Sequence, residues 1–246
     1  MVKNGLDATA FEGATEILYE VPDFRCEVHN PTVGVPTLWW RSVGHTHTAY
    51  AVECFVDELL AAARQDPLQG RLALMGDRHP RAAAVLRAVG EMAGWRGANP
   101  VNGRARGVAV VKSFNSYVAQ IVEVSLGRGG EPKVHKVRCA VDCGVAVNPD
   151  IIRAQMEGGI GFGLGHALYG EITLDAGKPV QTNFDSYRSL RIEEMPEVEV
   201  RIMASTESPT GVGEPGVPPI GPAVANALAA LGQESTRQLP MQGRTV

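Results

Sequence analysis

The stretch NPDIIRAQMEGGIGFGLGHALYG, residues 148–170, predicts the central helix around which the rest of the chain can be placed. Asn148 is a preferred helix N-cap and Pro149 suits the first helical position, so a helix should begin here. Five glycines follow between positions 155 and 165, although each costs a helix roughly 1 kcal/mol relative to alanine. Such a density is useful only where another group approaches the helix backbone closely. Two interpretations stay open: tight packing against a sheet, or a cofactor lying on the helix with Gln155 as a polar contact.

The segments around this helix alternate in the way that is typical of strands. Residues 107–127 predict one extended, β-branched stretch, and residues 133–144 predict the strand that returns after the turn RGGEP. Residues 170–181 predict a short hairpin, and residues 197–206 a further strand. A last helix is expected over residues 220–232, because Gly232 suits a helix end.

The first hundred residues carry helical patterns instead. Residues 48–64 place apolar side chains on one face at helical spacing, with Thr48 as the expected cap. Residues 79–95 predict a second helix, with a proline in its first turn and a glycine near its end. Residues 65–77 are expected to be a connector, and residues 1–48 short extended pieces.

The change of period near residues 98–107 predicts the main boundary of the chain. We therefore expect a helix-rich part, residues 1–100, and a sheet-rich part, residues 101–246, that share one site. The mixture of helices and strands predicts the α+β fold class.

The composition and motifs exclude several classes of protein. With 246 residues, a formal net charge of −4 and a pI near 5.9, the chain predicts no basic face for a nucleic acid partner. Its apolar runs stay shorter than the ~18 residues that suggest a membrane helix, and the start lacks the pattern of a signal peptide. Neither a P-loop nor a G-x-S-x-G elbow is found, which argues against P-loop nucleotide binding and against a serine hydrolase of that type.

A carboxylate lies in the stiffest and least polar loop of the chain. The stretch TGVGEPGVPP, residues 210–219, surrounds Glu214 with glycines, prolines and small apolar residues. Pro215 restricts the backbone of Glu214 to extended conformations. From the residues alone, Glu214 is either an exposed loop acid or a proton acceptor held in a rigid frame.

The stretch LWWRSVGHTHTAY, residues 38–50, places Trp40 and Arg41 just before a predicted helix start. An arginine at such a position suits an anion, whereas the tryptophans are equally at home in a core. His45 and His47 flank one threonine and have no third ligand nearby, so they are expected to be solvated loop residues. No residue is predicted to bind a metal directly.

Four stretches, taken together and in this order, resemble the C-terminal part of the molybdopterin-binding large subunit of the xanthine oxidase and aldehyde oxidase family. The branch they resemble most is that of isoquinoline 1-oxidoreductase beta subunits, which are aldehyde dehydrogenase-like. The stretches are WRSVGHTHTAYAVECFVDELLAAARQDPL (40–68), GRARGVAVVKSFNSYVAQIVEVS (103–125), AVDCGVAVNPDIIRAQMEGGIGFGLGHALYGEIT (140–173) and GVGEPGVPPIGPAVANALAAL (211–231).

The resemblance implies a molybdenum-dependent oxidoreductase. Such enzymes insert oxygen from water at an electrophilic carbon of an aldehyde or an N-heterocycle, and pass the electrons to [2Fe–2S] clusters on a partner subunit. Glu214, from its position in its motif, matches the catalytic base of the family. The residues that match the cofactor-binding positions are Trp40, Arg41, Gln155, Gly158, Gly159, Gly163 and Gly213.

The resemblance also implies partners and a cofactor form. The cofactor is expected to be molybdopterin as the cytosine dinucleotide, and the partners to be the N-terminal part of the large subunit and a small [2Fe–2S] subunit. The family's N-terminal molybdenum-site motifs are missing here, so the chain is expected to act only within an assembly, cytoplasmic or periplasmic. The alternative is a truncated, non-catalytic remnant or an assembly module of such a subunit.

Overall fold

The computed structural model describes residues 2, 3 and 5–241 and has a four-stranded sheet at its centre. The strand order is β3 (Ala105–Ser113), β4 (Ser116–Leu126), β5 (Pro132–Asp142) and β8 (Glu197–Ile202). The first three strands are antiparallel, and β8 joins β5 in parallel. The connection from β5 to β8 includes helix α4, Pro149–Tyr169, as a parallel pair requires.

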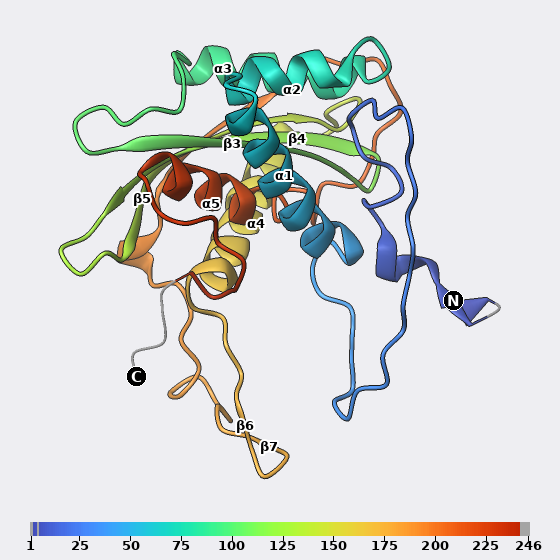
Figure 1. The fold of residues 1–246 in the computed structure, drawn as a ribbon. Helices are drawn as coiled ribbons and strands as arrows, with labels where there is room; N and C mark the ends of the chain where they lie inside the picture. The colour runs from blue at the N-terminus through green and yellow to red at the C-terminus, as the bar shows by residue number, and fades with distance from the viewer. Residues whose placement is uncertain (1, 4, 242–246) are drawn as a thin grey trace.

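Helices cover both faces of this sheet (Figure 1). Helices α2 (Pro67–Met75) and α3 (Pro80–Ala93) lie over one face, and α4 and α5 (Ile220–Ala230) over the other. Helix α1, Gly44–Ala62, crosses beside the sheet and contacts α2, α5 and β3. Helices and strands therefore form one α+β fold, as the sequence predicted.

The two faces of the sheet carry two apolar cores. Along β4, Val118 and Val122 pack towards α4 and α5, whereas Ala119 and Ile121 pack towards α2 and α3. Successive side chains of a strand point to opposite faces, so a strand buried on both sides reads as a nearly continuous apolar run. Helices from the first hundred residues thus complete a sheet built by the later ones, and the predicted two-part division stays a prediction. Positions 1, 4 and 242–246 of those parts lie outside the described residues.

Several short elements lie outside these layers. The hairpin strands β6 and β7 extend away from the sheet, and a short N-terminal hairpin precedes the first 3-10 turn (Figure 1). These elements are β1 (Val2–Lys3), β2 (Leu6–Asp7), η1 (Ala8–Phe11), β6 (Leu174–Asp175), β7 (Lys178–Pro179) and η2 (Ile192–Glu194).

Most of the predicted elements are confirmed where a cap or a glycine marks their ends. Asn148 caps α4 by accepting a hydrogen bond from the Ile151 amide. Gly94 ends α3 in the left-handed conformation, and Gly232 has a positive φ after α5. These local signals depend on a few neighbouring residues, so they can be found in the sequence.

Three expectations were wrong. Residues 65–77 contain helix α2, because Asp66 accepts hydrogen bonds from two amides and acts as its N-cap. Helix α1 begins at Gly44 and not at Thr48, whose hydroxyl instead bonds the carbonyl of Gly44. The stretch 107–127 is not one strand: it turns sharply between β3 and β4. The start of the chain also holds η1 and the first turn of α1, besides extended pieces.

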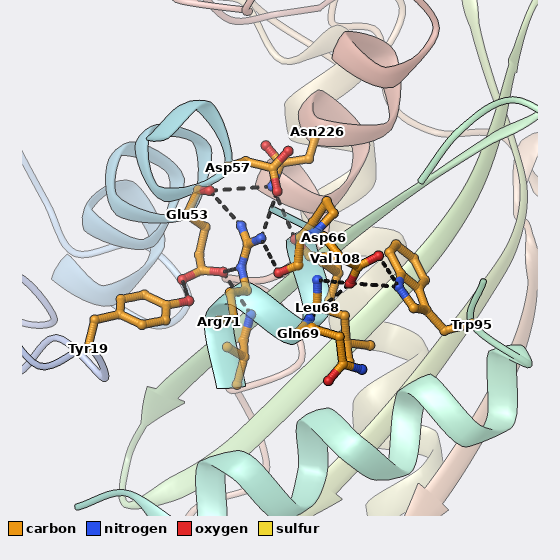
Figure 2. A network of polar contacts seen from close by, with 12 residues as sticks. Tyr19, Glu53, Asp57, Asp66, Leu68, Gln69, Arg71, Trp95, Val108 and Asn226 are labelled. Carbon is orange, nitrogen blue, oxygen red and sulfur yellow. Dashed lines mark hydrogen bonds and ion pairs between the residues drawn. The ribbon is translucent and has the colours of Figure 1, made fainter. Parts of the chain in front are cut away.

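A buried ionic network joins the N-terminal segment to α1 and α2 (Figure 2). Glu53 is 2% exposed and accepts hydrogen bonds from the Tyr19 hydroxyl and from Nε of Arg71, at 2.5 and 3.0 Å. Arg71 is fully buried and also donates to Asp57 at 2.7 Å. Burial raises the pKa of the Tyr19 hydroxyl, and the Glu53 carboxylate adds to this effect. The network holds residues from three segments in one arrangement, because a buried charge needs its partners.

Candidate functional site

Three segments that are far apart in the sequence meet at the N-terminal half of α4. They are the loop before α1, the first turns of α4 and the loop that leads into α5. Arg41 joins them: its Nε donates to the carbonyl oxygen of Gly213 at 2.8 Å, and its Nη2 donates to Oε1 of Gln155 at 3.0 Å. Nη2 also contacts the Gly213 carbonyl. The arginine, glutamine and glycine that the sequence singled out therefore lie in one cluster.

Glu214 lies in the same cluster and is half-buried. Its Oε1 accepts a hydrogen bond from the backbone amide of Ser42 at 2.9 Å, and its carbonyl accepts one from the Val217 amide at 2.9 Å. Among the described residues, no side chain or amide donates to Oε2. The carboxylate is thus held by one oxygen, and the other remains available to a ligand.

The loop before α1 has an unusual backbone. Ser42 and Val43 have φ values of 70° and 49°, and Val43 is β-branched. Residues other than glycine rarely adopt this region, and each such residue costs about 1–3 kcal/mol. Contacts around the loop must offset this cost, and they include the bond from the Thr46 hydroxyl to the Arg41 carbonyl at 2.8 Å. The orientation of the Ser42 amide towards Glu214 depends on this conformation.

Aromatic side chains flank the cluster. Trp40 stacks on Phe162 with ring centroids 4.9 Å apart, and meets His166 edge-on at 4.3 Å. The Arg41 guanidinium lies over the Phe162 ring at 5.7 Å. Burial lowers the pKa of His166, so this ring is neutral near pH 7. A cavity of about 380 Å³ adjoins this cluster, between α1, α4 and α5.

The sequence did not assign Phe162 and His166 to this site. They lie four positions apart on α4 and hence on one face of the helix. Their spacing was visible, but the partner that makes them a cluster is Trp40, more than 120 positions earlier in the chain. Only the folded structure brings these rings together.

The glycines of α4 divide into two groups. A Cβ at Gly159 would lie 3.3 Å from the backbone of Gly216, and one at Gly163 would lie 2.7 Å from the Ile220 side chain. At these two positions the helix packs tightly against the loop that carries Glu214. A Cβ at Gly158 would meet nothing within 4 Å, and one at Gly213 would lie 3.9 Å from Oε1 of Gln155. Gly158 and Gly213 therefore leave open surface beside the cluster.

The two histidines before α1 lie apart from this cluster. His47 pairs with the carbonyl of Ala10 at 3.2 Å, and His45 lies 3.5 Å from a carboxylate oxygen of Glu12. Within the part of the chain that the structure describes, no group of three or more His, Cys, Asp or Glu side chains could hold a metal ion. In the same part, none of the helices combines the length and the apolar character needed to cross a membrane.

Comparison with known proteins connects this geometry to a family. Residues 82–196 match the model of the molybdopterin cofactor-binding domain. The beta subunit of isoquinoline 1-oxidoreductase from Brevundimonas diminuta is 37% identical over 229 residues, which are 92% of this chain and 29% of that protein. One subunit of the nicotinate dehydrogenase from Pseudomonas putida is 27% identical over 246 residues, which are 93% of this chain and 21% of that protein.

A solved structure shares the fold. The aldehyde oxidoreductase from Desulfovibrio gigas superposes with a TM-score of 0.57 and 12% identity, over 78% of this chain and 39% of that one. At this identity the likeness concerns the fold alone. The chain spans less than a third of the length of the two curated relatives described above.

Proposed function

Since the chain belongs to the molybdopterin-binding subunits of the xanthine oxidase family, we propose that it forms part of a molybdenum hydroxylase that oxidises an aldehyde or an N-heterocycle. The observation that carries this proposal is the convergence of Arg41, Gln155 and Glu214, which come from three distant segments. These are the three polar side chains whose motifs match the family's site. Their contact supports one shared site, because unrelated surface residues have no reason to meet.

The residues of the cluster fit a molybdopterin cofactor. Arg41 uses Nε and Nη2 within the protein, and no hydrogen bond from Nη1 or from Nε2 of Gln155 is found among the described residues. A guanidinium and an amide suit the anionic and heterocyclic parts of such a ligand. Gly158 and Gly213 leave room beside them, and Trp40 supplies an aromatic wall. Gly159 and Gly163 would contribute indirectly, by seating α4 against the catalytic loop.

When bound, the cofactor supplies the two-electron redox chemistry. In our proposal Glu214 is the catalytic base and accepts the proton that is released as oxygen from water joins the substrate carbon. A half-buried carboxylate with one oxygen held by the Ser42 amide and the other available suits this role. The surrounding loop keeps its position, because Arg41 grips the preceding carbonyl.

We further propose the cytosine dinucleotide form of the cofactor. The rest of a large subunit and a small subunit with [2Fe–2S] clusters are the proposed partners, the latter receiving the electrons. The two relatives described above are more than three times as long as the matched segment, which supports action within a larger assembly. A non-catalytic remnant or assembly module remains the alternative function.

The metal content of the purified protein distinguishes these two functions. We expect stoichiometric molybdenum when the chain is produced together with the remaining parts of the enzyme, and little when it is produced alone. Elemental analysis by mass spectrometry gives this number directly. A complete assembly that contains this chain, yet neither binds molybdenum nor oxidises aldehydes or N-heterocycles, would favour the remnant.

A further inference from the structure

Two buried serines lie directly behind the proposed catalytic base. Oγ of Ser42 and Oγ of Ser113 are 2.7 Å apart, and the two residues are 0% and 1% exposed. Ser113 is the last residue of β3, whereas Ser42 belongs to the strained loop before α1. A buried hydroxyl needs a hydrogen-bond partner, so each serine depends on the other.

The strained backbone of Ser42 directs its amide to Glu214. The amide donates to Oε1 at 2.9 Å only while Ser42 holds its φ of 70°. This conformation is costly for serine and will relax unless other contacts hold it. The hydroxyl contact with Ser113 is anchored in the sheet, which is the most rigid neighbour of the loop.

The same turn of the sheet also holds the other side of the site. Phe114 and Asn115 have φ values of 49° and 60°, which makes the β3–β4 turn tight and places Ser116 opposite Ser113. Oγ of Ser116 donates to the carbonyl of Gly211 at 2.6 Å, and the Gly211 amide donates to the Phe114 carbonyl at 3.2 Å. The loop that carries Glu214 is therefore attached to this turn as well.

We propose that the β3–β4 turn is a template for the site, and that Ser42 and Ser113 are positioning residues for Glu214. The turn attaches to the Arg41–Val43 loop through Ser113 and to the 210–214 loop through Ser116. It thereby sets the distance at which the Ser42 amide meets the carboxylate. This inference rests on the proposed function of Glu214.

The first test is Ser113→Ala in the assembled enzyme. The variant leaves the Ser42 hydroxyl unpaired and lets the loop relax, so kcat should fall about tenfold, the loss that one misplaced hydrogen bond causes. KM should stay within about twofold and molybdenum content should not change, because Ser113 contacts neither substrate nor cofactor. Equal changes of kcat in the control Ser125→Ala, which removes a hydroxyl bonded to His135 at the far end of β4, would overturn the proposal.

A double-mutant cycle tests the pair itself. Ser42→Ala should lower kcat to a similar degree, and the double variant should be no worse than the worse single one, because the two hydroxyls serve one contact. If the two losses multiply instead, the serines act independently and the proposal is wrong. Amide hydrogen exchange gives a readout without turnover: peptides that cover residues 38–46 and 210–217 should exchange faster in Ser113→Ala.

The exchange measurement keeps this proposal separate from the proposed function. If Glu214→Gln retains full turnover, the proposed role of Glu214 fails, whereas faster exchange in Ser113→Ala still supports the template. Unchanged exchange in both peptides would overturn the template even if Glu214 proves to be essential.

Discussion

The backbone amide of Ser42 donates a 2.9 Å hydrogen bond to Oε1 of Glu214, although 172 positions separate the two residues in the sequence. The bond runs beside the contact of Arg41 with Gly213, so two consecutive residues of one loop hold two consecutive residues of another. The proposed base and the proposed cofactor ligand therefore belong to one rigid unit. A change in either loop should be felt by both functions.

Arg41 should control how well the cofactor is retained. We expect Arg41→Ala to lower the molybdenum content of the assembled enzyme, because it removes the guanidinium from Gln155, Gly213 and the cofactor surface. Arg41→Lys should not restore the content, since an ammonium cannot reproduce the planar fork. Elemental analysis is the measurement, with Arg153→Ala on the exposed side of α4 as the matched control. Unchanged molybdenum in Arg41→Ala would contradict the assignment.

The glycines of α4 should respond in opposite ways. Gly163→Ala places a methyl group 2.7 Å from the Ile220 side chain, and overpacking of this kind should cost about 1–3 kcal/mol of unfolding free energy. Gly158→Ala meets no neighbour and should raise stability by up to about 1 kcal/mol, since alanine favours the helix.

Denaturant unfolding of both glycine variants measures these changes. Cofactor content then reports on Gly158 separately: a loss in Gly158→Ala without a loss of stability would support its place beside the cofactor. Retention of a full complement of molybdenum would assign that surface to something else.

The buried network of Figure 2 should dominate the stability of the N-terminal half. Glu53→Ala leaves the fully buried Arg71 with an unmatched charge and should cost about 3–5 kcal/mol. The surface pair of Glu58 with Arg237 is the control, and Glu58→Ala should cost no more than about 1 kcal/mol. Similar unfolding midpoints for the two variants in urea would show that the buried network is not needed.

The ion pair of Arg81 with Asp142 should make stability fall in acid. Burial acts to raise the pKa of Asp142, but the Arg81 hydrogen bonds at 2.7 and 2.8 Å and the Gly144 amide outweigh it, so the pKa is lowered. The folded pKa thus lies below the unfolded one, near 3.9. The stabilisation is present above about pH 4 and is lost as pH falls through the folded pKa.

Asp142→Asn tests this sign. The variant should be less stable than the parent by about 1–3 kcal/mol at pH 7, and the gap should narrow towards pH 3, where the parent loses the same interaction. Urea titrations at the two pH values measure it, with Asp150→Asn as a fully exposed control. A gap that stays constant between pH 7 and pH 3 would contradict the ionic role of Asp142.

Much of the fold could be predicted, because its boundaries are marked by local chemistry. Asn148 and Pro149 start α4, and Gly94 ends α3, as the sequence indicated. Asp66 and Pro67 carry the same kind of signal for α2, but the surrounding polar residues concealed it. The turn at Phe114 and Asn115 lacks glycine, so the hairpin between β3 and β4 was missed.

The candidate site could be predicted only as a set of residues. Arg41, Gln155 and Glu214 were identified from their motifs, and the structure brings them into contact. The sequence offered no means of finding that Ser42 holds Glu214, or that Trp40 stacks on Phe162. Such contacts depend on tertiary packing between segments more than 100 positions apart, which no periodicity records.

The central claim is that Glu214 acts as the catalytic base, and Glu214→Gln tests it most directly. The amide keeps the size of the side chain and an oxygen for the Ser42 amide, but it cannot accept the proton. Turnover of the assembled enzyme with an aldehyde or N-heterocycle substrate should therefore fall at least ~10²-fold while molybdenum content stays unchanged. Glu207→Gln, an exposed acid just before the same loop, should leave both unchanged. Full turnover in Glu214→Gln, or loss of molybdenum together with activity, would contradict the claim.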